Sequence, residues 1–216
     1  MKALIGNTIT ILFMSLTGMN TFAQNVSHNY INTTRTSYKS KIFVSQAIEG
    51  EYGSMKSNQS SDSNSLVAST SSSQAKWQGY NLTSTLGLEV MKFIQFNVAH
   101  SSINLRSTSS SLEKLDGSRL TGGVRLSFLA PVANLELGGG VIGTRYDYQK
   151  DLETSDFYGS GVYYSIGMNY FTSDQVSVFG IAKIIDEHSI KSGGSSSTNS
   201  LSMKSTNLGV GVSLWL

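Results

Sequence analysis

The last residues of the chain alternate strictly between apolar positions and small or polar positions. Counting back from the carboxyl end, every second residue is apolar: Leu216, Leu214, Val212, Val210 and Leu208. The positions between them hold Trp215, Ser213, Gly211 and Gly209. A period of two places the two sets on opposite faces of a β-strand. The segment therefore predicts a strand with an apolar outer face and a tightly packed inner face, although half-buried strands of soluble sandwiches alternate as well.

Seven earlier segments show the same alternation. In one of them, Ile94, Phe96 and Val98 alternate with Gln95 and Asn97. Together with the C-terminal segment, they predict eight strands, the first seven at about residues 42–55, 76–88, 93–102, 118–128, 135–148, 157–170 and 175–185. In the seventh strand the sequence leaves the inner face open, because apolar residues occupy both faces. The run Gly138–Gly140 predicts a β-bulge or a sharp coil in the fifth strand.

The segments between these strands differ in length in a regular way. Long polar stretches are expected at residues 56–73, 103–116, 149–156 and 186–205. Short turns are expected near residues 89–92, 129–134 and 171–174. Long and short connections alternate, as they do in up-and-down transmembrane barrels with short periplasmic turns and longer extracellular loops. Closing the sheet also satisfies every backbone amide, which a bilayer requires. The prediction is an all-β fold: an eight-stranded antiparallel transmembrane β-barrel, with a ten-stranded barrel as the alternative.

The composition agrees with a barrel whose apolar residues are spread along the chain. Of 216 residues, 39% are hydrophobic and 14% are charged, with 21 Gly and one Pro. Soluble domains carry about 25% charged residues. The absence of cysteine excludes disulfides, a Cys-based zinc site and a Cys nucleophile. A net charge of +2 gives no nucleic-acid footprint, so no nucleic-acid partner is expected.

The N-terminus has the pattern of a secretory signal peptide. Lys2 supplies a positive end, residues 3–16 are mainly apolar, and Thr21-Phe22-Ala23 offers a cleavage site of small residues. We predict a signal peptide at residues 1–23, a polar periplasmic lead-in at 24–40 and the barrel at 41–216.

The inward faces of the predicted strands carry polar and charged side chains. They are Glu49, Glu51, Gln95, Asn97, Arg125, Glu136, Asn169 and Lys183. Buried charges of opposite sign are expected to pair, and Arg125 and Glu136 lie on strands joined by a short turn. Because an eight-stranded barrel is only wide enough for its own side chains, we expect a filled lumen. A narrow conduit for small solutes is the alternative.

Aromatic residues lie near both ends of the predicted strands. Near the long loops are Tyr80, Tyr146, Tyr148 and Tyr158. Near the short turns are Phe93, Phe96, Phe128, Tyr170, Phe171 and Trp215. We expect these rings at the two membrane–water interfaces.

One pair of residues is a candidate for catalysis. His100 and Ser102 share the outward face of the third strand, near the long-loop end. This arrangement is similar to the His and Ser of outer-membrane lipid A deacylases, which are also eight-stranded barrels. The Asn-Ala that follows in that family is replaced by Ile103-Asn104, and no carboxylate is placed to orient His100. We therefore expect a non-enzyme. No metal-ligand spacing surrounds the three histidines, and no cofactor or metal is expected.

Residues 41–216 as a whole resemble small outer-membrane barrels of the OmpA transmembrane-domain, OmpX and Ail type. The C-terminal segment with Leu208, Val210, Val212, Leu214 and Leu216 resembles the assembly signal of that family. The family usually ends in Phe or Trp, whereas this chain ends in Leu216 after Trp215. The resemblance implies the bacterial outer membrane, contact with its lipid and lipopolysaccharide, assembly by the barrel assembly machinery, and a structural or surface-interaction role through the loops. A deacylase-like lipid A enzyme and a small-solute channel are the functional alternatives.

Overall fold

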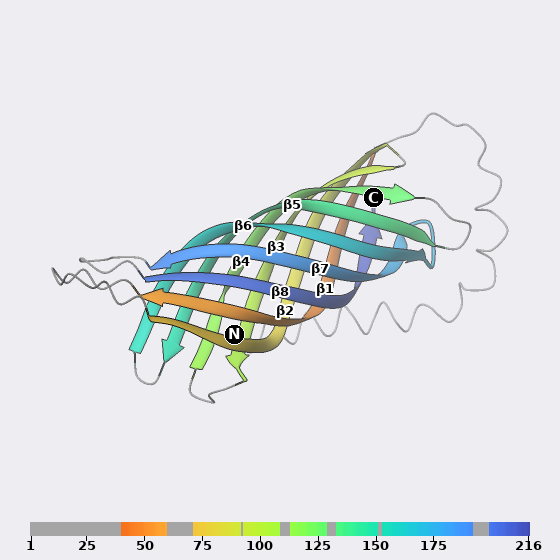
Figure 1. Ribbon diagram of the computed structural model, residues 1–216. Coiled ribbons are helices and arrows are strands. Elements are labelled where there is room, and N and C mark those ends of the chain that lie inside the picture. Colours follow the sequence, from red (N-terminus) through yellow and green to blue (C-terminus); the bar gives the residue numbers. More distant parts are fainter. Residues whose placement is uncertain are drawn as a thin grey trace.

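The computed structural model describes residues 40–59, 71–91, 93–108, 113–128, 133–150, 153–191 and 199–216. These residues form eight antiparallel strands in one closed barrel (Figure 1). The strands are β1 (Lys41–Gln59), β2 (Ser71–Met91), β3 (Ile94–Ser107), β4 (Glu113–Phe128), β5 (Asn134–Lys150), β6 (Glu153–Phe171), β7 (Val176–Lys191) and β8 (Asn199–Trp215). The predicted signal peptide, 1–23, and residues 24–39 of the predicted lead-in lie outside the described residues.

Each strand pairs with the next along the chain, and β1 pairs with β8. The predicted eight-stranded barrel is therefore confirmed, and the ten-stranded alternative is wrong. Within the described residues, no helix is long and apolar enough to cross a membrane.

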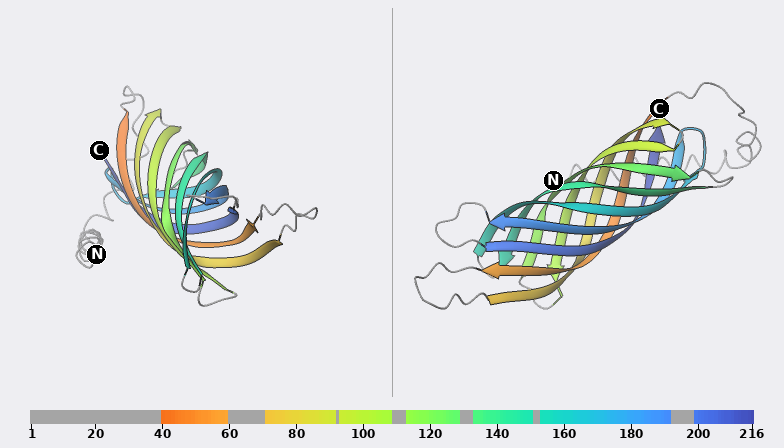
Figure 2. Two further views of the ribbon diagram at one scale, coloured as in Figure 1. Left: turned by 90° about the vertical axis from the view of Figure 1, so that its left-hand side faces the viewer. Right: turned by 45° about the horizontal axis from the view of Figure 1, so that its top comes forward.

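The strands wind steeply around the barrel (Figure 2). Paired residues can be followed across the whole sheet, from Gln46 on β1 through Ser84, His100, Leu120, Gly143, Ser160, His188 and Ser202. Ser202 pairs with Lys56, so the path returns to β1 ten residues after its start at Gln46. With a rise of about 3.3 Å per residue and about 4.8 Å between strands, this stagger corresponds to a tilt of about 40°.

The two rims of the barrel differ. The turn rim is the end where β1 begins at Lys41 and β8 ends at Trp215, and the loop rim is the opposite end. The intervals between strands at the loop rim are residues 60–70, 108–112, 151–152 and 192–198, and those at the turn rim are 92–93, 129–133 and 172–175. The predicted alternation of long and short connections is therefore only partly correct, because two residues join β5 to β6 at the loop rim and five join β4 to β5 at the turn rim.

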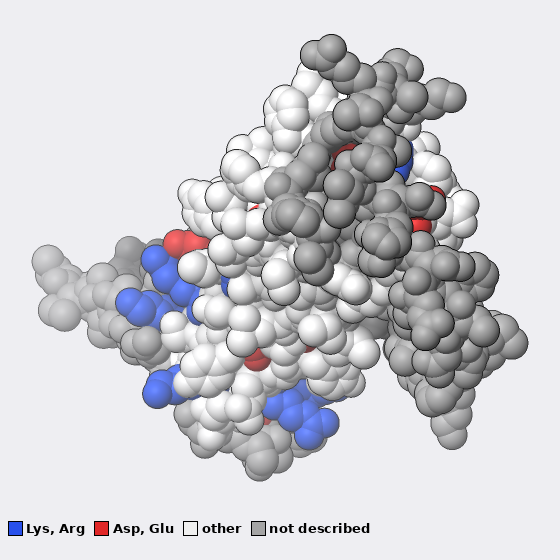
Figure 3. All heavy atoms as spheres, turned by 90° about the vertical axis from the view of Figure 1, so that its right-hand side faces the viewer, with Lys and Arg blue, Asp and Glu red and all other residues white. Residues whose placement is uncertain are grey.

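A band of apolar side chains covers the outer wall. On β8, Leu208 and Val210 are 65% and 67% exposed, and on β6 Tyr164 and Ile166 are 66% and 51% exposed. The band spans from Ile42 to Tyr52 on β1 and from Tyr80 to Leu88 on β2. Figure 3 shows a face of the molecule whose described wall is mostly uncharged, with Lys and Arg gathered toward its left and lower edges. An exposed apolar wall of this extent needs lipid as its solvent.

The pattern of polarity reverses between the band and the loop rim. On β3, Phe96 and Val98 face outward in the band, whereas closer to the loop rim the apolar Ile103 and Leu105 face inward and the charged Arg106 faces outward. Outside the bilayer, a strand is solvated on its outer face and hides its apolar residues inside.

This reversal explains why the predicted loops are too long. Parts of all four (56–73, 103–116, 149–156 and 186–205) belong to strands, which extend toward the loop rim beyond their predicted ends. Leu115 on β4 and Leu201 and Met203 on β8 are buried, although each lies among Ser and charged residues. Apolar residues at every second position with polar neighbours between them are typical of a strand. In this part of the sequence the high content of Ser and Lys makes that pattern look like a loop.

The three glycines of β5 do not form the predicted bulge. Gly138, Gly139 and Gly140 pair in unbroken register with both neighbouring strands. A Cβ at Gly140 would lie 2.1 Å from the carbonyl oxygen of Gly122 and 2.8 Å from Cε1 of Tyr163. Glycine is therefore required here because there is no space for a Cβ atom, and not because the strand forms a bulge. The irregularity in register lies instead between β2 and β3, at Glu89 and Met91.

Candidate functional site

Arg119 is the centre of a charged cluster inside the barrel. Its side chain comes from β4, faces the lumen and is almost fully buried. Arg119 Nη1 and Nη2 donate to the two carboxylate oxygens of Glu51 on β1 at 3.1 and 3.0 Å. Nη2 also lies 3.1 Å from Oε1 of Glu187 on β7 and 3.0 Å from the hydroxyl of Tyr146 on β5. The arginine thus joins side chains from β1, β5 and β7 across the lumen.

The carboxylate of Glu51 has further donors. Ser205 Oγ donates to Glu51 Oε1 at 2.6 Å, and Asn207 Nδ2 donates to Oε2 at 3.3 Å. Asn81 also donates to Oε2, and Tyr146 donates its hydroxyl proton to Glu187. A buried carboxylate with several donors and an arginine has the partners that its desolvation requires.

Two further ion pairs lie nearer the turn rim. Lys183 Nζ on β7 donates to Oε1 of Glu49 at 2.5 Å. Arg125 Nη1 lies 3.4 Å from Glu136 Oε2, which is the ion pair that the sequence suggests. Gln95 and Asn169 donate to the other oxygen of Glu136 at 3.3 and 3.4 Å.

All eight polar residues proposed from the sequence face the lumen, and the structure distributes them over separate clusters. Asn97 accepts a hydrogen bond from the hydroxyl of Tyr163 at 3.3 Å. Sequence reasoning missed Arg119 and Glu187, which form a buried ion pair. Arg119 lies an even number of residues from Arg125 and therefore faces the same side of β4. Glu187 is related to Lys183 in the same way, so extending the predicted seventh strand by two residues would have identified Glu187 as an inward-facing residue. For β7, the structure places Phe179 and Ile181 inside and Val178 outside.

An apolar cluster fills the lumen between the Arg119 cluster and the loop rim. It comes from β1–β6 and β8, and its members are Met55, Trp77, Ile103, Leu105, Leu115, Tyr146, Phe157, Leu201 and Met203. The edge of Tyr148 packs near the rings of Trp77 and Phe157, with centroids 6.0 and 6.3 Å apart. This section of the barrel therefore has an interior like that of a soluble β-protein.

An aromatic group lies inside the barrel at the turn rim. The ring of Trp215 is 4.8 Å from that of Phe43 and 5.4 Å from that of Phe171, and its indole nitrogen donates to Ser177 Oγ at 2.8 Å. Placing Trp215 and Phe171 at the membrane interface is therefore wrong. The same holds for Tyr146, which belongs to the Arg119 cluster, and for Tyr148, which packs against the apolar cluster in the lumen. These residues occupy positions of their strands that face the lumen, and this orientation outweighs the preference of aromatic rings for membrane interfaces.

Side chains leave little space in the middle of the lumen. A cavity of about 10 Å³ lies among the Arg119, Lys183 and Tyr163 side chains, which is room for about one water molecule. Among the described residues, no group of three or more His, Cys, Asp or Glu side chains is arranged to hold a metal ion.

The outer wall carries His100 and Ser102, both exposed. His100 pairs in register with Ser84 and Leu120, and Ser102 pairs with Leu82 and Ser118. In the part of the chain that the structure describes, no hydrogen bond joins His100 to Ser102 or to a carboxylate. The arrangement of a base oriented by a third group is not formed in this structure.

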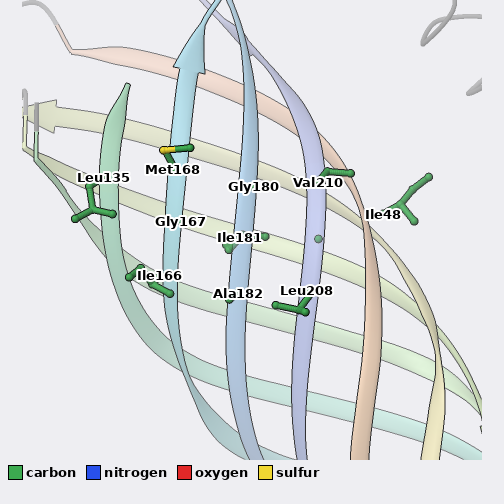
Figure 4. A pocket seen from close by; sticks show the side chains of 11 residues that line it. Ile48, Leu135, Ile166, Gly167, Met168, Gly180, Ile181, Ala182, Leu208 and Val210 are labelled. Carbon is green, nitrogen blue, oxygen red and sulfur yellow. The ribbon is translucent and has the colours of Figure 1, made fainter. Parts of the chain in front are cut away.

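A shallow groove of about 500 Å³ interrupts the apolar wall over β6, β7 and β8 (Figure 4). Gly180 and Ala182 form its floor, because they occupy outward positions with little or no side chain. Its walls include Ile166, Met168 and Leu208. The groove lies within the apolar band, where hydrocarbon chains are the surrounding solvent. The five apolar residues of the C-terminal segment, including Leu208 and Leu216, all lie on this outward face.

The fold matches those of solved outer-membrane proteins. AlkL, solved in DMPC lipid bilayers, superposes with a TM-score of 0.53 at 12% identity, over 85% of this chain and 93% of that one. OprG from Pseudomonas aeruginosa gives a TM-score of 0.51 at 10% identity, over 80% of this chain and 95% of that one. Neisserial surface protein A gives 0.47 at 13% identity, over 78% of this chain and 97% of that one.

No protein-family model matches the chain, and no curated protein matches it significantly. At these identities the structural matches establish the fold alone. The closed barrel, its apolar outer band and the shared fold together make this chain an eight-stranded β-barrel protein of the bacterial outer membrane.

Proposed function

We propose that this protein has a structural or surface-interaction role in the outer membrane, that it is not an enzyme and that its lumen does not conduct solutes. The observation that carries the proposal is the continuous filling of the lumen: the aromatic group at the turn rim, the ion pairs in the middle and the apolar cluster toward the loop rim. A solute would have to displace buried ion pairs and a packed apolar core.

The extension of the strands supports contact at the cell surface. Transmembrane barrels have their short turns on the periplasmic side, which places the turn rim, with Lys41 and Trp215, there and makes the loop rim face outward. β1, β2 and β8 continue past the apolar band, so their ends at Gln59, Ser71 and Asn199 lie outside the hydrocarbon layer. Surface-interaction sites are commonly carried by connections held on a rigid scaffold.

Planar bilayers test the absence of conduction. The full barrel, folded in detergent and checked by its heat-modifiable migration on a gel, is expected to give no single-channel steps under conditions where a known porin conducts. Reproducible steps from the wild-type protein would contradict the filled lumen and favour the small-solute channel.

The surface role is tested in cells. Expression is expected to change detergent sensitivity, or the sedimentation and surface attachment of the cells, compared with cells lacking the protein. No change in any of these properties would contradict the proposal.

Lipid A analysis tests the enzymatic alternative, which is favoured only by the exposure of His100 and Ser102 on the outer wall. We expect lipid A of identical mass from cells with the wild-type protein, with His100→Ala, and without the protein. Loss of an acyl chain that depends on His100 would make the protein an enzyme.

A further inference from the structure

Four basic side chains on the neighbouring strands β1 to β4 lie on the outer face of the barrel, between the apolar band and the loop rim. We call them the basic stripe: Lys56, Lys76, Arg106 and Lys114. Next to each in its strand is a residue buried inside the barrel: Met55, Trp77, Leu105 and Leu115. Since successive side chains of a strand point to opposite faces, all four basic side chains point outward.

The register places the four residues side by side. Arg106 lies directly opposite Lys114. Gln78 pairs with Arg106, which makes Lys76 the diagonal neighbour of Arg106. Lys76 pairs with Ser54, so Lys56 is in turn diagonal to Lys76. Cβ atoms are about 5 Å apart in directly opposite pairs and about 7 Å apart in diagonal pairs.

Little negative charge compensates the stripe. Lys114 forms an ion pair with Asp116, which is also the diagonal neighbour of Arg106 and lies opposite Asp147 on β5. The side chains of Lys56, Lys76 and Arg106 form no ion pair or hydrogen bond with any residue that the structure describes. Like charges placed opposite each other on adjacent strands are destabilising, so this arrangement favours a bound anion.

The other half of the rim is different at the same height. Lys204 on β8 pairs with Asp186 at 3.1 Å, and the guanidinium of Arg145 on β5 lies 5.5 Å from the centre of the Tyr158 ring. Asp147 and Asp156 are paired in register there. Uncompensated positive charge on the described outer face is therefore concentrated over β1 to β4.

The stripe lies just outside the hydrocarbon layer. Tyr52 and Tyr80, which are 53% and 59% exposed, are the last large apolar side chains of the outer face on β1 and β2. Lys56 and Lys76 each lie four residues farther toward the loop rim, which at a tilt of about 40° is about 10 Å along the barrel axis. Lipid headgroups occupy this level, and long basic side chains extend to reach them.

We propose that the basic stripe binds the phosphate groups of a phosphorylated glycolipid, of the lipid A type, in the outer leaflet. Phosphate suits the site because an arginine fork and adjacent ammonium groups bind its oxygens with charge-assisted hydrogen bonds. The groups of the stripe are held on rigid paired strands, and acyl chains of the same lipid would lie on the apolar wall below Tyr52 and Tyr80. The inference rests on the outward orientation of the loop rim in the proposed function, and not on the closure of the lumen.

Native mass spectrometry of the full barrel in detergent tests the proposal with three probes: bisphosphorylated lipid A, the same lipid A without phosphate, and inorganic phosphate. The test variant is Lys76→Gln with Arg106→Gln. The matched control is Arg145→Gln with Lys204→Gln, which removes the same charge from the other half of the rim. Heat-modifiable migration verifies that both variants fold.

Bisphosphorylated lipid A is expected to bind the wild type and the control variant similarly and the test variant about 30-fold more weakly, from about 1 kcal/mol for each cation at a charged surface. Equal weakening in both variants, equal binding of lipid A without phosphate, or binding of inorganic phosphate as strong as that of the lipid would each overturn the proposal. A conducting wild-type barrel would overturn only the proposed closure of the lumen.

Discussion

Replacing Arg119 is expected to be among the most damaging changes to the barrel. The side chain is 2% exposed and contacts two carboxylates, those of Glu51 and Glu187. Arg119→Met keeps an apolar stem of similar length but leaves both carboxylates buried without their cation. Removing one partner of a buried pair costs about 3–5 kcal/mol. Because two carboxylates lose the same partner, we expect a cost at the upper end of this range.

The matched control is Arg125→Met, which has the same chemistry at a weaker site. Arg125 makes one contact of 3.4 Å to Glu136, and its side chain remains 11% exposed. Partial access of water and a long contact reduce the expected cost to about 1–2 kcal/mol. The difference between the two variants depends on burial and on the number of partners, since the residue type is the same.

Urea unfolding in phospholipid vesicles measures both free energies. Both tryptophans, Trp77 and Trp215, are buried in the lumen and report on unfolding by fluorescence. Adding Glu51→Gln to Arg119→Met is expected to recover part of the loss, because one uncompensated charge disappears while Ser205 and Asn207 still offer hydrogen bonds. If Arg119→Met costs no more than Arg125→Met, the electrostatic reasoning is refuted.

Three other substitutions test the fold in the same assay. Gly140→Ala is expected to cost about 1–3 kcal/mol because its Cβ meets backbone atoms, whereas Gly143→Ala, with nothing within 4 Å of the new Cβ, is expected to cost nearly nothing; equal costs would contradict the packing argument. Leu105→Ala is expected to cost about 2–5 kcal/mol, although its neighbours Asn104 and Arg106 are polar, and a surface-like cost below about 0.5 kcal/mol would show that the apolar cluster is not a core. Leu208→Arg is expected to cost about 2–4 kcal/mol in the middle of the apolar band, and Ser202→Arg near the loop rim about 0–1 kcal/mol; the reverse order would contradict the position of the band.

The wall of the barrel was predictable because one rule operates along its whole length inside the bilayer. Ile94, Phe96 and Val98 face lipid, and Gln95 and Asn97 face the lumen, as the alternation requires. The lumen adds a steric constraint that no periodicity reveals. Gly140 is required by the backbone of Gly122 on one adjacent strand and the ring of Tyr163 on the other, and only three-dimensional contact distinguishes this role from a bulge.

The sequence does not predict the section toward the loop rim because the alternation reverses there: apolar residues face the lumen and polar residues face outward. Leu115, Leu201 and Met203 are isolated apolar residues in polar surroundings, and the composition of a window around them is that of a loop. The period of two persists through both sections, so the parity of a strand is more informative than its local hydrophobicity. Glu187 was overlooked for the same reason, since it lies beyond the end predicted for β7.

The reversal of apolar and polar faces along the strands also constrains how the protein enters the membrane. In the orientation proposed above, the hairpins carry Lys56, Lys76 and Arg106 from the periplasm through the hydrocarbon layer to the far side. Crossing one by one, with bare charged faces toward lipid, would cost about 2–4 kcal/mol for each cation at the midplane. Passage of several hairpins together, their charged faces turned toward one another or toward an assisting protein, avoids that barrier. Moving the charged ends of β1 to β3 across the bilayer is therefore expected to be the slowest stage of insertion.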